Sequence, residues 1–242
     1  MTPVLEAKRL SKKVTSPEGT LTILDSVDLQ ITKGETVAIV GASGAGKSTL
    51  LGLLAGLDVP SEGEVWLDGT ELTALDEDGR ASIRADRVGF VFQSFHLVPS
   101  LTALENVMLP LELASAAQPA QAALEALRTV GLEQRRRHYP HQLSGGEKQR
   151  VAIARAYVVQ PSVLFADEPT GNLDQKTGEH VVELLFQLNR ESGTTLVLVT
   201  HDLSLASRCQ RILYMEGGRF IDAPESQVNT GEAIMASGSS SA

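Results

Sequence analysis

A glycine-rich segment between two apolar stretches constrains the fold of this chain more than any other feature. The run Gly41-Ala-Ser-Gly-Ala-Gly-Lys-Ser48 follows the short apolar stretch 37–40 and precedes the longer apolar stretch 49–57. A strand, a glycine-rich loop and a helix in this order bind phosphate, because the N–H groups of the loop and the positive end of the helix point at its oxygens. A glycine-rich turn without a ligand does not require Lys-Ser at this offset. The segment therefore predicts a phosphate-binding loop.

The side chains at the end of this loop have predicted roles. Lys47 is expected to reach the β- and γ-phosphates of a nucleotide, and the hydroxyl of Ser48 is expected to ligate Mg²⁺. We expect the following residues of the loop to bind the nucleotide: Gly41, Ser43, Gly44, Ala45, Gly46, Lys47, Ser48 and Thr49.

Two adjacent carboxylates follow a second apolar run. Asp167 and Glu168 come directly after residues 163–166. Ligands of an open α/β sheet lie beyond the carboxyl ends of its strands, so both carboxylates should share an edge with the phosphate loop. Asp167 would then hold Mg²⁺, and Glu168 would orient or deprotonate the attacking water. A strand followed by an acidic turn is the plainer interpretation, and only the pairing with Lys47 favours the catalytic one.

The spacing of the apolar runs predicts an α/β fold. Four short runs are rich in Val, Ile and Leu: 37–40, 88–92, 163–166 and 195–199. They alternate with longer helical patterns, which is typical of parallel strands with crossover helices. The alternating segments 27–31 and 64–67 lie beside Gly and Pro and predict antiparallel strands. The predicted fold is a mixed, mainly parallel sheet with an antiparallel β edge subdomain.

A helical lobe is expected where the strand signals stop, between residue 101 and about residue 137. The stretch 114–130 is rich in Ala and Leu and is interrupted by Pro119, which predicts two or three helices. We expect one domain over residues 1–231 and a short tail, with these parts: a core and β edge over 1–93 and 160–231, a helical lobe over about 94–159, and a flexible tail over 232–242.

Composition and charge exclude several classes of protein. Apolar residues make up 42 % of the chain, but the apolar runs are far shorter than the roughly 20 residues that cross a bilayer. The net charge of −9 is opposite to that of a nucleic-acid-binding surface, so no nucleic acid partner is expected. Residues 1–10 lack the apolar core of a secretion signal, and Cys209 is the only cysteine. We therefore expect a cytoplasmic protein without an internal disulfide.

The segment Leu143-Ser-Gly-Gly-Glu147 has two sound interpretations. Ser144 and Glu147 match a capping box, which would simply start a helix over 148–159. A capping box does not need Gly145 and Gly146, however, and a glycine-rich helix N-terminus offers N–H groups to an anion. Both interpretations can hold together.

These segments together resemble the ATPases of ABC transporters along nearly the whole chain. The matching motifs occur in the order of that family: the phosphate loop, Gln93, Leu143-Ser-Gly-Gly-Glu147, Phe165-Ala-Asp-Glu-Pro-Thr-Gly-Asn-Leu-Asp174 and Thr200-His201-Asp202. The Ser-Gly-Gly motif separates this family from other phosphate-loop proteins. The resemblance implies a P-loop NTPase with a RecA-like core that hydrolyses ATP to ADP and phosphate.

The resemblance also implies a site shared between two copies of the chain. In such ATPases, ATP lies between the phosphate loop of one copy and the helix end at Ser144, Gly145 and Gly146 of the other. Asp174 would then touch the partner copy. His201 would contact the γ-phosphate and orient Glu168 and the water.

Gln93 directly follows the predicted strand 88–92, where its side chain can reach Mg²⁺ or the attacking water. Its backbone leads into the helical lobe, so this residue is placed to couple the state of the nucleotide to the position of the lobe.

Within the family, the chain is most similar to the lipoprotein-release and macrolide-export group (LolD/MacB), and in that group to the YbbA-type subunits. The similarity rests on Gly89-Phe-Val-Phe-Gln-Ser-Phe95, Leu104-Glu-Asn-Val107 and the segment that ends at Asp174. It implies an integral membrane permease partner of FtsX/MacB-like type, with this chain peripheral on the cytoplasmic face of the inner membrane. It also implies that such a motor transmits movement across the membrane or exports lipid, lipoprotein or small hydrophobic cargo.

The chain departs from the family pattern in one respect. Family members carry an early aromatic residue that stacks on adenine, whereas this chain has no Tyr, Phe or Trp before Trp66. Val14 or a neighbour would offer only apolar contact to the base.

Two other functions are compatible with the phosphate loop. A soluble ABC ATPase that acts on DNA or ribosomes usually carries a second cassette, a long insertion or a basic arm, and this chain has none. A small-molecule kinase would leave the Ser-Gly-Gly motif and His201 without a role. We therefore rank the transporter ATPase first.

Overall fold

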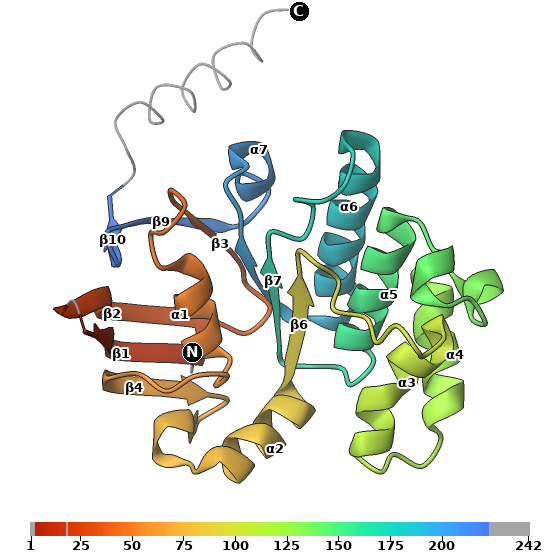
Figure 1. The fold of residues 1–242 in the computed structure, drawn as a ribbon, viewed down its shortest axis with the longest axis horizontal. Coiled ribbons are helices and arrows are strands. Elements are labelled where there is room, and N and C mark those ends of the chain that lie inside the picture. The colour runs from red at the N-terminus through yellow and green to blue at the C-terminus, as the bar shows by residue number, and fades with distance from the viewer. Residues whose placement is uncertain (1–2, 18, 223–242) are drawn as a thin grey trace, which may run out of the picture.

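The structure, a computed structural model, describes residues 3–17 and 19–222. The tail expected over 232–242 lies outside these residues. Figure 1 shows a body that contains two sheets, and beside it a lobe built from α3, α4 and the start of α5. Among the described residues, no helix has the length and apolar character needed to cross a membrane.

The larger sheet carries the strands that the apolar runs predicted. Its six strands lie in the order β10-β9-β3-β8-β7-β6, and all neighbours are parallel except the edge pair β9 and β10. The bounds are β3 (Thr36–Val40), β6 (Val88–Phe92), β7 (Val163–Asp167), β8 (Thr195–Val199), β9 (Arg211–Glu216) and β10 (Arg219–Ile221). Every residue of β3 and β8 is buried, as expected for central parallel strands covered on both faces. The predicted mixed, mainly parallel sheet is confirmed.

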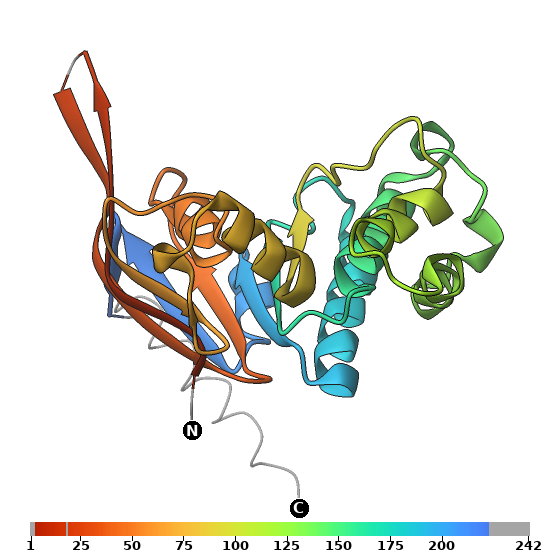
Figure 2. The same cartoon turned by 90° about the horizontal axis from the view of Figure 1, so that it is seen from below.

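The early strands form a second sheet of their own. This antiparallel sheet has the order β2-β1-β4-β5, with bounds β1 (Pro3–Ser16), β2 (Gly19–Thr32), β4 (Glu62–Leu67) and β5 (Thr70–Glu71). The expected strands 27–31 and 64–67 are parts of β2 and β4, whereas β1 was not anticipated from the sequence. The β1–β2 hairpin reaches beyond the body, as Figure 2 shows.

The helix that follows the phosphate loop packs between the two sheets. α1 (Lys47–Leu54) buries Leu50, Leu51, Leu53 and Leu54 in a cluster that includes residues of both sheets. At about 25 cal/mol per Å² of apolar surface, each of these side chains contributes roughly 1.5–3 kcal/mol when fully buried. The phosphate loop therefore connects a buried strand to a buried helix, which fixes both of its ends.

The other helices cover the body and form the lobe. Their bounds are α2 (Glu77–Arg87), α3 (Ala103–Leu113), α4 (Pro119–Thr129), α5 (Gly145–Tyr157), α6 (Gln175–Ser192) and α7 (Leu203–Ala206), with single 3₁₀ turns at Leu72–Ala74, Glu133–Arg135 and Pro140–Gln142. The expectation for residues 114–130 was wrong in detail. Pro119 does not interrupt helices there but begins α4 at its first position, where the missing N–H costs nothing.

The lobe and the larger sheet share one apolar core. A single cluster joins side chains of α3, α4 and α5 to β6, β7 and β8. α5 forms the link, because it buries seven of its residues along its length. The lobe is therefore packed directly against the strands that end beside Gln93 and at Asp167.

Candidate functional site

The phosphate loop has the geometry that its glycines require. Gly46 has φ +99° and caps the N-terminus of α1, a conformation that side chains rarely adopt. A Cβ atom on Gly41 would lie 2.1 Å from the carbonyl oxygen of Met215, so only glycine fits there. The loop therefore curls closely over the end of β3 and presents the N-terminus of α1 to the solvent.

Lys47 lies folded over this loop. Its Nζ donates to the carbonyl oxygens of Gly41 at 2.7 Å and Ala42 at 2.9 Å. These bonds hold the ammonium group close to the place where phosphate oxygens would bind.

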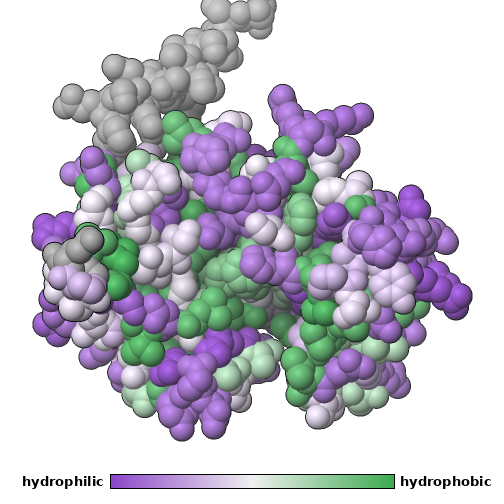
Figure 3. Space-filling model, viewed as in Figure 1, coloured by the Kyte–Doolittle hydropathy of each residue, from purple (hydrophilic) through white to green (hydrophobic). Residues whose placement is uncertain are grey.

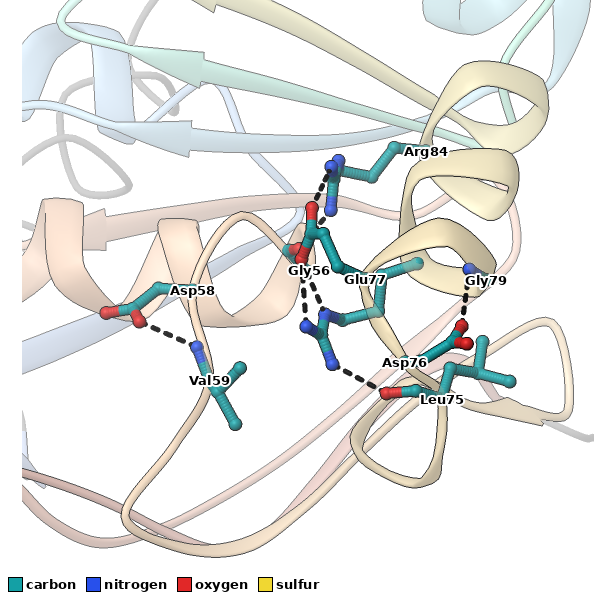
Figure 4. Close-up of polar contacts among 9 residues, drawn as sticks. Gly56, Asp58, Val59, Leu75, Asp76, Glu77, Gly79 and Arg84 are labelled. Carbon is teal, nitrogen blue, oxygen red and sulfur yellow. Dashed lines mark hydrogen bonds and ion pairs between the residues drawn. The ribbon is translucent and has the colours of Figure 1, made fainter.

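Arg84 of α2 binds the chain just after the C-terminal end of α1. Arg84 of α2 donates to the carbonyl oxygen of Gly56 at 2.5 Å and pairs with Glu77 at 2.7 Å, as Figure 4 shows. A cation at the C-terminal end of a helix satisfies free carbonyls and complements the helix dipole. α2 thus stabilises the helix whose other end forms the phosphate site.

Asp167 ends β7 beside the phosphate loop. Burial raises the pKa of its carboxyl, and the negative charge of Glu168 raises it further, while a hydrogen bond with Ser48 and the charge of Lys47 lower it. The structure therefore brings together the carboxylate and the hydroxyl that were expected to hold Mg²⁺. Carboxylate and hydroxyl oxygens such as those of Asp167 and Ser48 are the kind of ligand that this ion prefers.

Glu168 occupies a strained backbone position. Its φ is +46°, which costs about 1–3 kcal/mol for a residue with a side chain, and its N–H donates to the carbonyl oxygen of Val199 at 2.9 Å. One carboxylate oxygen, Oε1, lies 2.9 Å from Nδ1 of His201. The Glu168 side chain is 18 % exposed, and the His201 side chain is 77 % exposed. Strain of this kind is maintained where a side chain must point in a set direction.

The predicted residues line one open cleft of about 690 Å³, a volume within the usual range for a small-molecule site. Ten of them surround it: Ser43, Gly44, Gly46, Lys47, Ser48, Thr49, Gln93, Asp167, Glu168 and His201. Gly41 and Ala45 belong to the same loop, and the Ala45 side chain is buried beneath it.

Besides Gly41 and Ala45, four predicted residues lie outside the described lining of this cleft, and they belong to other parts of the chain. Ser144 caps α5, with its Oγ accepting from the N–H of Glu147 at 3.2 Å, so the expected capping box is confirmed. Gly145 and Gly146 form the first turn of that helix on the lobe. Asp174 caps α6, and hydrogen bonds from the Thr177 hydroxyl and N–H lower the pKa of its carboxyl. Within one chain, these residues do not complete the phosphate site.

Gln93 contacts the loop that follows the carboxylates. Its Nε2 lies 3.5 Å from Oδ1 of Asn172, and Asn172 Nδ2 donates to the carbonyl oxygen of Gln93 at 3.0 Å. A Cβ atom on Gly171 would lie 2.6 Å from Gln93 Nε2, so the two loops pack face to face. The segment at Gln93, which leads from β6 into the lobe, is therefore hydrogen bonded to the segment between Glu168 and Asp174.

Sequence reasoning missed Gln149 of α5. Its side chain is fully buried, and its Nε2 donates to the carbonyl oxygens of Pro169 at 2.7 Å and Phe92 at 3.4 Å. Pro169 follows Glu168 directly and Phe92 precedes Gln93, so one amide group holds the helix of the Ser-Gly-Gly motif against both loops. The available signal was a polar residue close before the apolar run 151–154 of the same helix.

Replacing Gln149 with leucine is expected to lower the free energy of unfolding by about 1–3 kcal/mol, because the buried carbonyl group of Pro169 and the part-buried one of Phe92 lose their donor. Urea denaturation checks this value, with Gln187→Leu on the exposed face of α6 as the matched control. Equal stability of the two variants would contradict the role given to Gln149.

Comparisons with known proteins agree with this geometry. The family model described as ABC transporter matches residues 24–171. The Escherichia coli (strain K12) protein YbbA, described as an uncharacterized ABC transporter ATP-binding protein, is 56 % identical over 89 % of this chain and 96 % of its own length. The lipoprotein-releasing system ATP-binding protein LolD of Pseudomonas syringae pv. tomato is 50 % identical over 91 % of this chain and 98 % of its own.

A solved structure is similar over the same length. It is the dimeric post-hydrolysis state of the ATP-binding cassette MJ0796 bound to ADP and phosphate, with a TM-score of 0.83 and 45 % identity over 89 % of this chain and 96 % of that one. The phosphate loop, the carboxylates at the end of β7 and the Ser-Gly-Gly helix start thus occur on a shared fold. This chain belongs to the ABC transporter family, as one of its ATP-binding subunits.

Proposed function

We propose that this chain is the ATP-hydrolysing motor subunit of an ABC transporter, which closes as a dimer on ATP and drives a separate permease subunit. The observation that carries the proposal is the single cleft in which Lys47 and Ser48 face Asp167, Glu168 and His201. The groups that would bind phosphate, hold the metal and activate water follow or end three neighbouring strands, β3, β8 and β7.

The phosphates of ATP would lie on the loop and on the N-terminus of α1. Lys47 is held at the loop by two carbonyl oxygens, which it can exchange for phosphate oxygens without a large movement. Ser48, Asp167 and Gln93 would hold Mg²⁺ through oxygen atoms. When bound, Mg²⁺ neutralises charge that develops on the β- and γ-phosphates.

Glu168 is the group best placed to activate water. Its carboxylate can accept a proton from the water as the water oxygen bonds to the γ-phosphorus and the bond to the ADP oxygen breaks. His201 lies within hydrogen-bond distance of the same carboxylate, and it would hold Glu168 in line with the γ-phosphate.

The second half of the site would come from a second copy. Ser144, Gly145 and Gly146 lie on the lobe at the start of α5, outside the lining of the cleft. Their free N–H groups suit an anion, and Ser144 presents a hydroxyl at the same helix end. The dimeric ADP-and-phosphate state of the similar cassette supports this arrangement.

An apolar groove between the body and the lobe suits the permease. A hollow of about 270 Å³ is lined mainly by β6, α2, α3 and α5, including Val88, Phe90, Phe92, Leu109 and Leu113. Figure 3 shows hydrophobic residues gathered along this side of the molecule, and Leu113 is 78 % exposed. We infer a permease of FtsX/MacB-like type at the cytoplasmic face of the inner membrane, in keeping with the lipoprotein-releasing relative.

The test is Mg²⁺-dependent ATP hydrolysis by the purified chain and by Asp167→Asn. Chelation of Mg²⁺ is expected to abolish turnover, and the substitution is expected to reduce it by about 10²-fold or more. The pKa of Asp167 is raised in the folded state, so its ionised form is less stable there than in the unfolded chain. At a pH above the ordinary pKa of aspartate this lowers the free energy of unfolding, and the loss disappears as the pH falls and the carboxyl becomes protonated.

The ligand-free Asp167→Asn protein should therefore unfold at a temperature no lower than the parent at pH 7, while it loses the stabilisation by Mg²⁺ and ATP. Unchanged turnover in the variant, or hydrolysis without divalent cations, would contradict the proposal.

A further inference from the structure

The capping box at the start of α5 places a carboxylate at the helix end that would receive the γ-phosphate of a second copy's ATP. Glu147 Oε2 accepts the N–H of Ser144 at 2.8 Å, and the Glu147 side chain is only 18 % exposed. The N–H of Ser144 holds the pKa of this carboxyl below its usual range, with smaller effects from the Ser144 hydroxyl and from Arg135, although burial raises it. Glu147 is therefore ionised at neutral pH, and a lone negative charge there would repel the phosphate.

Arg135 supplies a cation for this carboxylate. Its Nε donates to Glu147 Oε1 at 2.9 Å. Among the residues that the structure describes, Arg135 is the one cationic side chain within ion-pair distance of Glu147. One carboxylate oxygen is thus bound by the helix cap and the other by the guanidinium. The N–H groups of Gly145 and Gly146, which the helix itself cannot satisfy in its first turn, therefore share this helix end with a neutralised pair and not with a free negative charge.

The fold of the lobe holds Arg135 in this place. The residue ends a single 3₁₀ turn after α4, and the segment that follows it is bound to the first turn of α3. There the carbonyl oxygens of Arg136 and His138 accept the N–H groups of Leu104 at 3.0 Å and Ala103 at 2.8 Å. Nη1 of Arg135 also lies 3.2 Å from Nε2 of His138. The guanidinium is therefore fixed at the start of α5 by contacts within the lobe, before any nucleotide binds.

We propose that Arg135 is a positioning residue of the site shared between two copies: it neutralises Glu147, so that the helix end at Ser144 can receive the γ-phosphate bound by the second copy. This inference rests on the proposed function, because only a closed dimer brings a phosphate to this helix end. Neither Arg135 nor Glu147 is among the described residues that line the phosphate cleft of their own chain. Loss of Arg135 therefore weakens closure of the dimer and leaves nucleotide binding by the single chain unchanged.

The experiment measures the dissociation constant of the dimer by analytical ultracentrifugation at saturating ATP and Mg²⁺, with Glu168→Gln in every chain to prevent hydrolysis. Arg135→Met should raise this constant by about 3- to 10-fold, a modest factor because the ion pair is half-exposed, although the dimer carries the change in both sites. Adding Glu147→Gln to Arg135→Met should restore the constant to within about twofold, because the amide keeps an acceptor for the N–H of Ser144 and has no charge. Binding of ADP with Mg²⁺, measured by calorimetry, should be equal in all these chains.

Arg128→Met is the matched control, since Arg128 is a similarly exposed arginine of the lobe that pairs with Glu133 at 2.9 Å, away from the start of α5. It should leave the dimer constant unchanged. An unchanged constant for Arg135→Met would overturn the proposal. So would a weakened dimer that Glu147→Gln does not restore, because Arg135 would then only support the fold of the lobe. If the chain with Glu168→Gln alone formed no dimer with ATP, the proposed function itself would fail, and this inference with it.

Discussion

Replacing Glu168 with glutamine is expected to reduce ATP turnover by about 10²–10⁴-fold while ATP binding is retained. The amide keeps the size of the side chain and one acceptor oxygen, but it cannot take a proton from water. Lys47, Ser48 and Asp167, which would bind the phosphates and Mg²⁺, are unchanged. The variant should therefore accumulate in the ATP-bound state and elute as a dimer in size-exclusion chromatography with ATP and Mg²⁺.

The control is Glu179→Gln, because Glu179 is an exposed carboxylate on α6 outside the described lining of the phosphate cleft. It should keep the turnover of the parent chain and should not form a long-lived dimer with ATP. Full turnover by Glu168→Gln would exclude Glu168 as the proton acceptor. A monomeric enzyme that is fully active would exclude the dimeric mechanism.

The parts of the site that the sequence could predict are those fixed by local chemistry. The strand 37–40, the glycines after it and Lys47 are contiguous, so their geometry follows from the short-range rules of strands, loops and helix ends. Asp167 joins them because parallel strands of one sheet end at the same edge, which needs only the recognition of a second strand. The capping box at Ser144 is local in the same sense.

The parts that could not be predicted depend on pairing between distant segments. β1 is rich in Lys, Arg and Ser, and it becomes a strand because β2 and β4 both hydrogen bond to it. The contacts of Gln149 with Pro169 and Phe92 join residues 20 and 57 positions away. Such contacts follow from the packing of α5 against the sheet, which no spacing along the chain reveals.

The same limit applies to Leu21 of β2, which lines the cleft beside the phosphate loop. Leu21 reaches the cleft only because the β1–β2 hairpin is held at the phosphate loop by Gly46 and Gly218. An exposed leucine on a predicted hairpin would otherwise be unremarkable, since single apolar residues are common on protein surfaces.

Mixing two inactive variants is expected to restore ATP turnover, which is the strongest test of a site shared between two copies. Lys47→Ala removes the ammonium group that we propose to bind the phosphates. Ser144→Asp keeps a good N-cap for α5, so its fold should persist, but it places a negative charge where the partner's γ-phosphate would lie. Each variant alone carries the same defect in both sites of its dimer, so each should lose turnover by about 10²-fold or more.

A mixed dimer concentrates both defects in one site. The intact loop of the Ser144→Asp chain then meets the intact helix end of the Lys47→Ala chain, and this pair forms one unaltered site. Since half of the dimers in an equal mixture are mixed and each has one such site, turnover should reach about a quarter of the parent value. If all the groups that hydrolyse ATP came from one chain, mixing the two variants would not restore ATP turnover. Ser144 would then serve only as the N-cap of α5 and would have no role in the site.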